Sequence, residues 1–234
     1  SAKKGVSKTP VKSALLIEGH GFENDAHAGD KVRQASLLSI ESIKKTGDKK
    51  VNPGDFAENI TTEGIELNAW MIKPSNFNAD KKYPVFLTFY GGPGSNKVNN
   101  SFDGRDYFWH QMLAEKGYIV MCVDNRGTMY RGKAFKHSTY KQLGKLEVAD
   151  QIETAKYLGT LPYVDKARIG TFGWSFGGYL SSLCITKGAD YFKTAIAVAP
   201  VTNWRYYDGI YTERFMSLPQ ENASGYDDNS PINH

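Results

Sequence analysis

The stretch Ala167–Leu183, ARIGTFGWSFGGYLSSL, places a serine, Ser175, between two glycines in a Gly-x-Ser-x-Gly pattern. A strand-like run, RIGTFG, precedes the serine, and a helix-like run, GGYLSSLC, follows it. This context predicts a sharp strand-to-helix turn that exposes the serine hydroxyl at the carboxyl edge of a sheet. Such a turn requires strained backbone angles at the serine, and the glycines leave room for it. The alternative is a tight glycine turn that serves only packing.

Residues from Trp70 onward alternate between strand-like and helix-like runs. YPVFLTFYGG and YIVMCVDNRG are rich in β-branched and aromatic residues and end in glycine, which is typical of strands. EVADQIETAKYLGTL has the spacing of an amphipathic helix, and KTAIAVAP predicts another strand after the serine. Near-continuous apolar strands separated by helices predict a mostly parallel sheet covered on both faces.

Residues from about 67 to 234 resemble the catalytic domain of the prolyl oligopeptidase family, in its dipeptidyl-peptidase IV branch. The matching stretches include KKYPVFLTFYGGPGS, GTFGWSFGGY and AVAPVTNWRYYDGIYTERFM. The resemblance implies an α/β-hydrolase fold, with a doubly wound, mostly parallel sheet. It also implies a serine peptidase that needs no cofactor and acts on peptides with proline or alanine at the penultimate position.

The same resemblance implies a role for each matched site residue. Ser175 is the expected nucleophile, and the Tyr90 hydroxyl and the Phe176 backbone N–H are expected to stabilise the oxyanion. Both donors are neutral, which suits a transient negative charge. The expected pocket for the small penultimate side chain is lined by Val201, Trp204, Tyr207 and Tyr211. The alternative for these side chains is ordinary core packing.

In this family the triad acid and base follow the nucleophile, and we find no stretch after Ser175 that resembles the segments carrying them. His234 is the only later histidine, and the earlier His110 and His137 fall on segments whose family counterparts are not catalytic. We therefore expect the last strands of the hydrolase sheet to be missing. A serine without a base is a weak nucleophile at neutral pH, so we expect little or no peptidase activity from this chain.

The first sixty or so residues have a different character. NDAHAGDKVRQASLLSIESI and VNPGDFAENITTEGIEL resemble the N-terminal half of a MOSC domain, a sulfur-handling module, over about residues 8–67. The resemblance implies a site for the molybdenum cofactor or another anionic ligand around Asp25, His27, Arg33 and Asn59. A guanidinium group at position 33 suits an oxyanion or a phosphate. The alternative is a plain turn at DAHAG with a surface charge after it.

The two resemblances meet at TTEGIELNAW and predict a fusion of two partial domains, a β-rich MOSC-like segment at 1–66 and a hydrolase domain at 67–234. Within the first segment, apolar residues at helical spacing predict a helix over 35–47. Two other functions stay open, a cofactor-binding or sulfur-carrier protein and a non-functional hybrid whose exposed strand edges promote aggregation. The sequence leaves open whether the fusion is natural, engineered or an artefact of gene assignment.

The composition argues against several other classes of protein. Lys and Arg number 29 against 25 Asp and Glu, and this mild, evenly spread excess does not indicate nucleic-acid binding. No apolar run approaches the ~20 residues of a membrane span. No signal peptide is visible, which favours a cytoplasmic location.

Cys122 and Cys184 lie in apolar runs without ligands at metal-binding spacing, so buried thiols are expected rather than a zinc site. Nothing in the sequence indicates an oligomeric state.

Overall fold

In the computed structural model, the described residues are 16–17, 21–22, 38–39, 58–62, 65–99 and 104–234. The chain divides into two compact units, Ser1–Asn59 and Ile60–His234. The described strands that begin in the first unit are β1 (Leu16–Ile17), β2 (Gly21–Phe22), β3 (Leu38–Ser39) and β4 (Glu58–Thr62). β1 pairs with β2 in antiparallel fashion, and β3 pairs in parallel with the start of β4. The helix predicted over 35–47 is therefore wrong at the two residues of β3, because they pair with a neighbouring strand.

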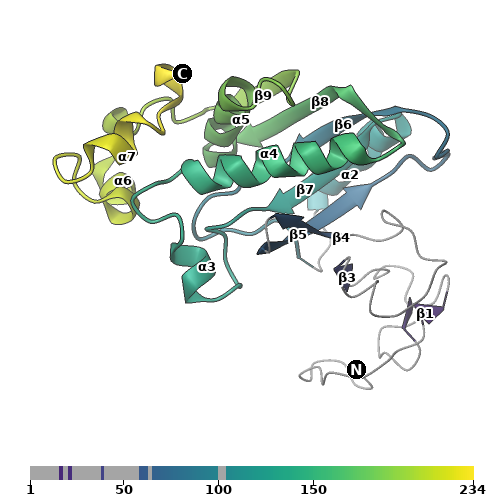
Figure 1. Ribbon diagram of the computed structural model, residues 1–234, viewed down its shortest axis with the longest axis horizontal. Coiled ribbons are helices and arrows are strands. Elements are labelled where there is room, and N and C mark those ends of the chain that lie inside the picture. The colour runs from purple at the N-terminus through teal and green to yellow at the C-terminus, as the bar shows by residue number, and fades with distance from the viewer. Residues whose placement is uncertain (1–15, 18–20, 23–37, 40–57, 63–64, 100–103) are drawn as a thin grey trace. The chain divides into compact units, whose positions relative to one another are not determined.

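The second unit contains a mixed, mostly parallel sheet (Figure 1). Its further strands are β5 (Ile65–Ile72), β6 (Tyr83–Thr88), β7 (Ile119–Asp124), β8 (Val164–Trp174) and β9 (Thr194–Val198). The spatial order of the described strands is β4-β5-β7-β6-β8-β9. Neighbours among β7, β6, β8 and β9 run parallel, whereas β5 is antiparallel to both of its neighbours. The mostly parallel sheet predicted from the apolar runs is confirmed.

Helices cover both faces of this sheet (Figure 1). The described α-helices are α2 (Gly104–Glu115), α3 (Lys133–His137), α4 (Lys145–Thr160), α5 (Phe176–Lys187), α6 (Gly209–Met216) and α7 (Ala223–Asp227). α4 and α5 pack against each other and against β8, whereas α2 packs on β5 and β7. Phe86 and Phe172 contact Trp109 of α2, so the alternating side chains Val85 and Leu87 face the other side of the sheet.

The core of the second unit lies around the central strands. All six residues of β7 are buried, as expected for a strand that is covered on both faces. α5 contributes a continuous apolar surface that includes Phe176, Leu180 and Leu183, each of them almost fully buried. Both cysteines are buried as well, one in β7 and one in α5. The strand and the helix that flank Ser175 are therefore anchored in the best-packed part of the described structure.

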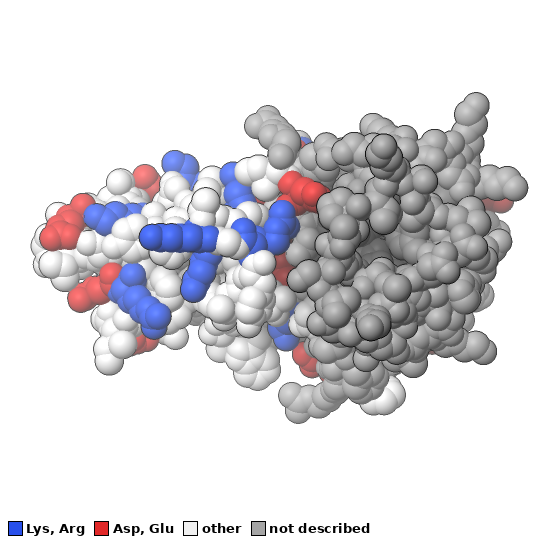
Figure 2. All heavy atoms as spheres, turned by 90° about the horizontal axis from the view of Figure 1, so that it is seen from below, with Lys and Arg blue, Asp and Glu red and all other residues white. Residues whose placement is uncertain are grey.

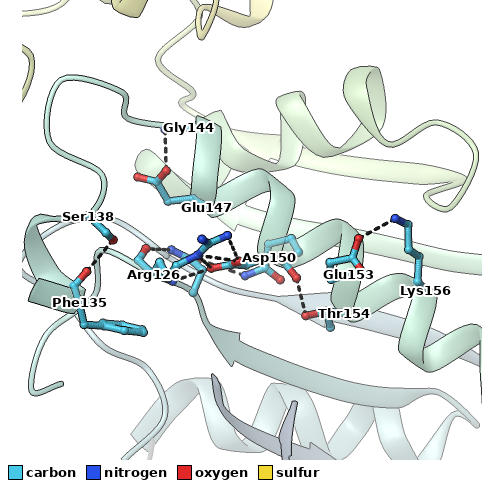
Figure 3. A network of polar contacts seen from close by, with 11 residues as sticks. Arg126, Phe135, Ser138, Gly144, Glu147, Asp150, Glu153, Thr154 and Lys156 are labelled. Carbon is cyan, nitrogen blue, oxygen red and sulfur yellow. Dashed lines mark hydrogen bonds and ion pairs between the residues drawn. The ribbon is translucent and has the colours of Figure 1, made fainter. Parts of the chain in front are cut away.

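A polar network joins the carboxyl end of β7 to α4 (Figure 3). Arg126 contacts the Asp150 carboxylate through its backbone N–H at 2.8 Å, through Nε at 3.0 Å and through Nη2 at 2.6 Å. The Asp150 side chain is fully buried, so the guanidinium compensates a carboxylate that would be costly to bury alone. Gln151 adds bonds from α4 to the Val123 carbonyl and the Asn125 side chain, both at 3.1 Å. The network fixes the start of α4 relative to the sheet edge.

The described surface carries charges of both signs. Both basic and acidic side chains appear on the described part of the face in Figure 2. No helix among the described residues has the length and apolar character needed to cross a membrane. These findings add no partner class to those considered from the sequence.

Candidate active site

Ser175 occupies the turn between β8 and α5, and its backbone has φ 56° and ψ −113°. This positive φ lies outside the regions that non-glycine residues ordinarily adopt. The Ser175 N–H donates to the Val198 carbonyl at 2.8 Å, and the Ser175 carbonyl accepts from the Tyr179 N–H at 2.9 Å. Backbone bonds on both sides therefore hold the residue in a conformation that costs about 1–3 kcal/mol. Strain of this kind at a serine is an observation that points to function.

The two glycines of the motif are required by the closeness of the backbone around Ser175. A Cβ on Gly173 would overlap the backbone carbonyl group of Gly177, and a Cβ on Gly177 would overlap the carbonyl oxygen of Phe89. These neighbours are backbone atoms of the sheet and of α5, so they cannot move aside cheaply. The strand-to-helix turn predicted from the motif is confirmed, and it brings α5 against the loop that follows β6.

Tyr90 follows β6 and reaches Ser175 from the neighbouring strand end. The Ser175 side chain lies close enough to the Tyr90 hydroxyl to influence its pKa. Burial raises the pKa of Tyr90, the nearby Tyr207 raises it further, and the Ser175 side chain opposes the shift. The phenol therefore stays protonated at neutral pH and can donate a hydrogen bond to a developing oxyanion.

Phe176 places a second donor beside the serine. It is the first residue of α5, so its N–H belongs to the first turn, where no intrahelical acceptor exists. Its ring lies 6.1 Å from the Tyr90 ring and 6.0 Å from that of Trp204, measured between centroids. The structure thus brings together all three residues predicted to act in catalysis, whose roles stay predictions.

An aromatic cluster adjoins this group and is formed by three of the predicted substrate-binding residues. Trp204 and Tyr211 stack with ring centroids 6.2 Å apart and an interplanar angle of 12°. Tyr207 stands edge-on to both, at 6.1 Å from Trp204 and 5.6 Å from Tyr211. Trp204 is 1% exposed and Tyr207 is 42% exposed, so the cluster runs from the core to the surface. Tyr90 lies close enough to Tyr211 to raise its pKa, after the larger effect of burial.

Val201, the fourth predicted pocket residue, is buried in the same hydrophobic core as Trp204. Ordinary core packing, the alternative to a pocket, accounts for the Val201 side chain and the Trp204 indole, because both are almost fully buried. Core packing does not account for Tyr207, because this residue is substantially exposed beside the serine turn. The described structure is therefore compatible with a binding surface that is formed by Tyr207 and backed by buried aromatic groups.

Two residues behind the cluster, Tyr179 and Glu147, were not among the site residues predicted from the sequence. Both are fully buried within helices that look ordinary in sequence, and both make polar contacts there. One available signal was the position of Glu147, an acidic residue three places after Gly144 at the start of α4, which is the spacing of a capping box.

The residues predicted to bind a cofactor cannot be placed in the same way. Asp25, His27 and Arg33 lie outside the described residues. Asn59 belongs to β4, of which only the backbone course is described. The MOSC-like segment, its molybdenum cofactor and the predicted fusion therefore stay predictions.

Comparison with known proteins gives a consistent result for the second unit. The family model that matches is the prolyl oligopeptidase family, over residues 105–234. A probable dipeptidyl-aminopeptidase B from Trichophyton verrucosum is 43% identical over 98% of this chain, and its counterpart from Paracoccidioides lutzii is 47% identical over 95%. These alignments cover 27% and 26% of the two relatives, so the chain spans about a quarter of their length.

A solved structure supports the same relationship. Dipeptidyl peptidase 4 from Porphyromonas gingivalis aligns with a TM-score of 0.70 and 50% identity, over 75% of this chain and 25% of that one. The family match covers more than half of the chain, and the strand-to-helix serine turn lies within it. The chain belongs to the prolyl oligopeptidase family.

Proposed function

We propose that this chain carries the nucleophile, the oxyanion donors and the penultimate-residue pocket of a serine dipeptidyl peptidase. The observation that supports this most strongly is the strained Ser175 turn, with the Tyr90 side chain close to the serine and beside the aromatic cluster. The names of the relatives, dipeptidyl-aminopeptidase B and dipeptidyl peptidase 4, agree with this proposal. The substrate is a peptide with proline or alanine as its second residue.

The proposed reaction follows from the positions of these groups. The Ser175 hydroxyl gives its proton to a base and attacks the carbonyl carbon of the second substrate residue. The side chain of that residue packs against Tyr207 and the stacked pair behind it. The carbonyl oxygen becomes an oxyanion, which accepts hydrogen bonds from the Tyr90 hydroxyl and the Phe176 N–H. The peptide bond breaks as the leaving amine takes the proton from the base, and water then hydrolyses the acyl-serine to release a dipeptide and free Ser175.

The attack also requires a base that takes the serine proton. Within the described residues, the backbone of Ser175 bonds to Val198 and Tyr179 and its side chain lies near that of Tyr90, and none of these neighbours is a histidine. The family resemblance implies that the acid and base come from segments that follow the nucleophile. We therefore expect residues 1–234 alone to turn over substrate slowly or not at all. The rate should be at most roughly 10³–10⁴ times the uncatalysed rate in water.

The test is hydrolysis of glycyl-prolyl-p-nitroanilide by a polypeptide of residues 1–234 and by the same chain joined to the segment that carries the triad acid and base in a dipeptidyl-aminopeptidase B relative. This extended chain is called the full-length protein in all tests below. We expect rapid release of nitroaniline by the full-length protein and little by the short one. Leucyl-leucyl-p-nitroanilide serves as the control substrate, because its second side chain is larger than proline. Equal turnover of both substrates, or none of the prolyl compound by the full-length protein, would contradict the proposal.

Replacing Tyr90 with phenylalanine is expected to lower kcat by about 10²–10³-fold, because one oxyanion donor is lost. KM should change much less, since the phenol contacts charge that develops only in the transition state. Steady-state kinetics of the full-length Tyr90→Phe variant measures both constants. Tyr118→Phe is a matched control at a partly exposed tyrosine after α2. A higher KM with an unchanged kcat would mean that Tyr90 does not stabilise the oxyanion.

The second function predicted from the sequence, binding of a molybdenum cofactor or sulfur carrier by residues 8–67, receives no support from a described side chain. The alignments with dipeptidyl-aminopeptidases extend over 95–98% of the chain, so they include most of this segment. That prediction and the prediction of a non-functional hybrid stay untested.

A further inference from the structure

Tyr179 lies directly behind the aromatic cluster and contacts three other segments of the second unit. Its hydroxyl accepts a hydrogen bond from Trp204 Nε1 at 3.1 Å and lies 2.8 Å from the carbonyl oxygens of both Leu143 and Asn229. Its ring stands edge-on to Phe176 at 5.1 Å and to Trp204 at 4.9 Å. Because the side chain is fully buried, each of these polar contacts is made without competition from water.

Trp204 transmits this constraint to the proposed binding surface. Its indole stacks on Tyr211 and meets Tyr207 edge-on, as described above. The Nε1–H bond to Tyr179 and a backbone N–H bond to Ser230 Oγ at 3.0 Å set the orientation of the indole plane. A rotation of the indole would displace both tyrosines, so the Tyr179 hydroxyl determines where the pocket rings lie.

The turn at Leu143–Gly144 is the second support of the cluster. The Leu143 carbonyl meets the Tyr179 hydroxyl, and the Leu143 N–H donates to Met216 Sδ at 3.3 Å, at the end of the helix that carries Tyr211. Gly144 has φ 91°, and a Cβ at this position would overlap the Tyr179 hydroxyl. The turn therefore fits closely between Tyr179 and α6, and a shift of its backbone would move both.

Glu147 holds this turn from the first turn of α4 (Figure 3). Its Oε2 accepts the Gly144 N–H at 2.9 Å, whereas its Oε1 is buried and has no hydrogen-bond partner among the residues that the structure describes. The ionisable groups that face the carboxyl group are Asp150 on α4, Arg126 after β7, Tyr179 on α5 and Tyr211 on α6. Burial is the largest influence on Glu147 and raises its pKa to about 8, so the carboxyl group is neutral at pH 7.

We propose that Tyr179 and Glu147 are positioning residues that hold the rings of Trp204, Tyr207 and Tyr211 in place for the penultimate side chain of the substrate. This inference rests on the proposed peptidase function. Glu147 does so in its neutral form, because an ionised carboxylate would place an unpaired buried charge beside the hydroxyls of Tyr179 and Tyr211. The pocket should therefore weaken as the pH rises through the range in which this carboxyl group ionises.

Tyr179→Phe and Glu147→Gln in the full-length protein test this proposal. Phe keeps the ring and removes the hydroxyl, and we expect KM for glycyl-prolyl-p-nitroanilide to rise about tenfold, as for one lost hydrogen bond, with kcat within about threefold. Gln imitates the neutral carboxyl group, so the variant should keep its KM at pH 9 better than the wild type does. The substrate amino group titrates in the same range for all variants, so the difference between them isolates Glu147.

Glu153→Gln is the matched control, because Glu153 lies on the same helix and pairs with Lys156 at the surface. It should leave KM and its pH dependence unchanged. A Tyr179→Phe enzyme that loses kcat at constant KM, or a Glu147→Gln profile identical to the wild type, would overturn the proposal. Should Tyr179→Phe fail to fold, Glu147→Gln alone decides.

A spectroscopic measurement separates this inference from the peptidase proposal. Fluorine NMR of 5-fluorotryptophan at position 204, assigned with Trp204→Phe, reports the indole environment without any substrate. We expect its resonance to shift with a midpoint near pH 8 in the wild type and not in Glu147→Gln. A resonance independent of pH would overturn the positioning role even in an active peptidase. A shifting resonance in a protein that does not cleave the prolyl substrate would instead refute the peptidase function.

Discussion

Replacing Ser175 with alanine is expected to lower kcat/KM of the full-length protein for a glycyl-prolyl substrate by about 10⁴-fold or more, because no covalent intermediate can form. Stability should change by less than about 1 kcal/mol, since the backbone bonds to Val198 and from Tyr179 do not involve the side chain. Steady-state kinetics together with thermal unfolding separates the loss of chemistry from a loss of folded protein.

Ser182→Ala is the matched control for that substitution. Ser182 lies on α5, two turns after the nucleophile, and its hydroxyl bonds only to the carbonyl of Gly178 among the contacts of the described residues, at 3.0 Å. Its removal should leave kcat/KM within about twofold, as for a helical serine whose bond stays within its own helix. Residual activity above about a tenth of wild type in Ser175→Ala would mean that another group is the nucleophile.

Replacing Gly173 with alanine is expected to destabilise the hydrolase unit by about 3 kcal/mol and to abolish activity. The added methyl group would overlap the backbone of Gly177, and the turn cannot open without breaking the packing of α5 on the sheet. Soluble yield, thermal unfolding and kcat/KM of the full-length variant measure the effect.

We expect Gly159→Ala, in the same unit, to keep its stability, in contrast to Gly173→Ala. Gly159 lies in the last turn of α4, and a Cβ there would contact only Lys166 Cβ at an ordinary distance of 3.7 Å. Alanine is preferred to glycine in a helix by up to about 1 kcal/mol, so this variant should be as stable as wild type or more so. If Gly173→Ala behaves like Gly159→Ala, the strained turn does not exist as described.

Sequence reasoning predicted the second unit well because its signals are local. Parallel strands that lie between helices are built from apolar runs, so β6, β7 and β9 are visible as such in the sequence, although only β7 is buried throughout. α4 shows its helical spacing over 16 residues. In the first unit the same reasoning assigned Leu38–Ser39 to a helix, whereas these residues pair with Glu58–Asn59. Pairing across 20 residues of chain is not encoded in local spacing.

In the candidate site, too, features set by local sequence could be predicted, whereas features set by contacts between distant segments could not. The Ser175 turn could be predicted because close contacts within the turn itself require its glycines. Tyr90 and the aromatic residues were found through family resemblance, since nothing in their spacing indicates that they meet. Tyr179 and Glu147 were missed because each looks like an ordinary helical residue, and their significance lies in contacts with Leu143, Gly144 and Trp204 from other segments.

The most direct test of the central claim, that Ser175 is the nucleophile of a post-proline dipeptidyl peptidase, is labelling of the full-length protein with a fluorophosphonate probe. Peptide mapping by mass spectrometry then identifies the modified residue. We predict one equivalent of label on Ser175, slowed by an excess of a glycyl-proline peptide and absent from Ser175→Ala. Labelling of a different serine, or labelling of Ser175 that a prolyl peptide does not slow, would contradict this account.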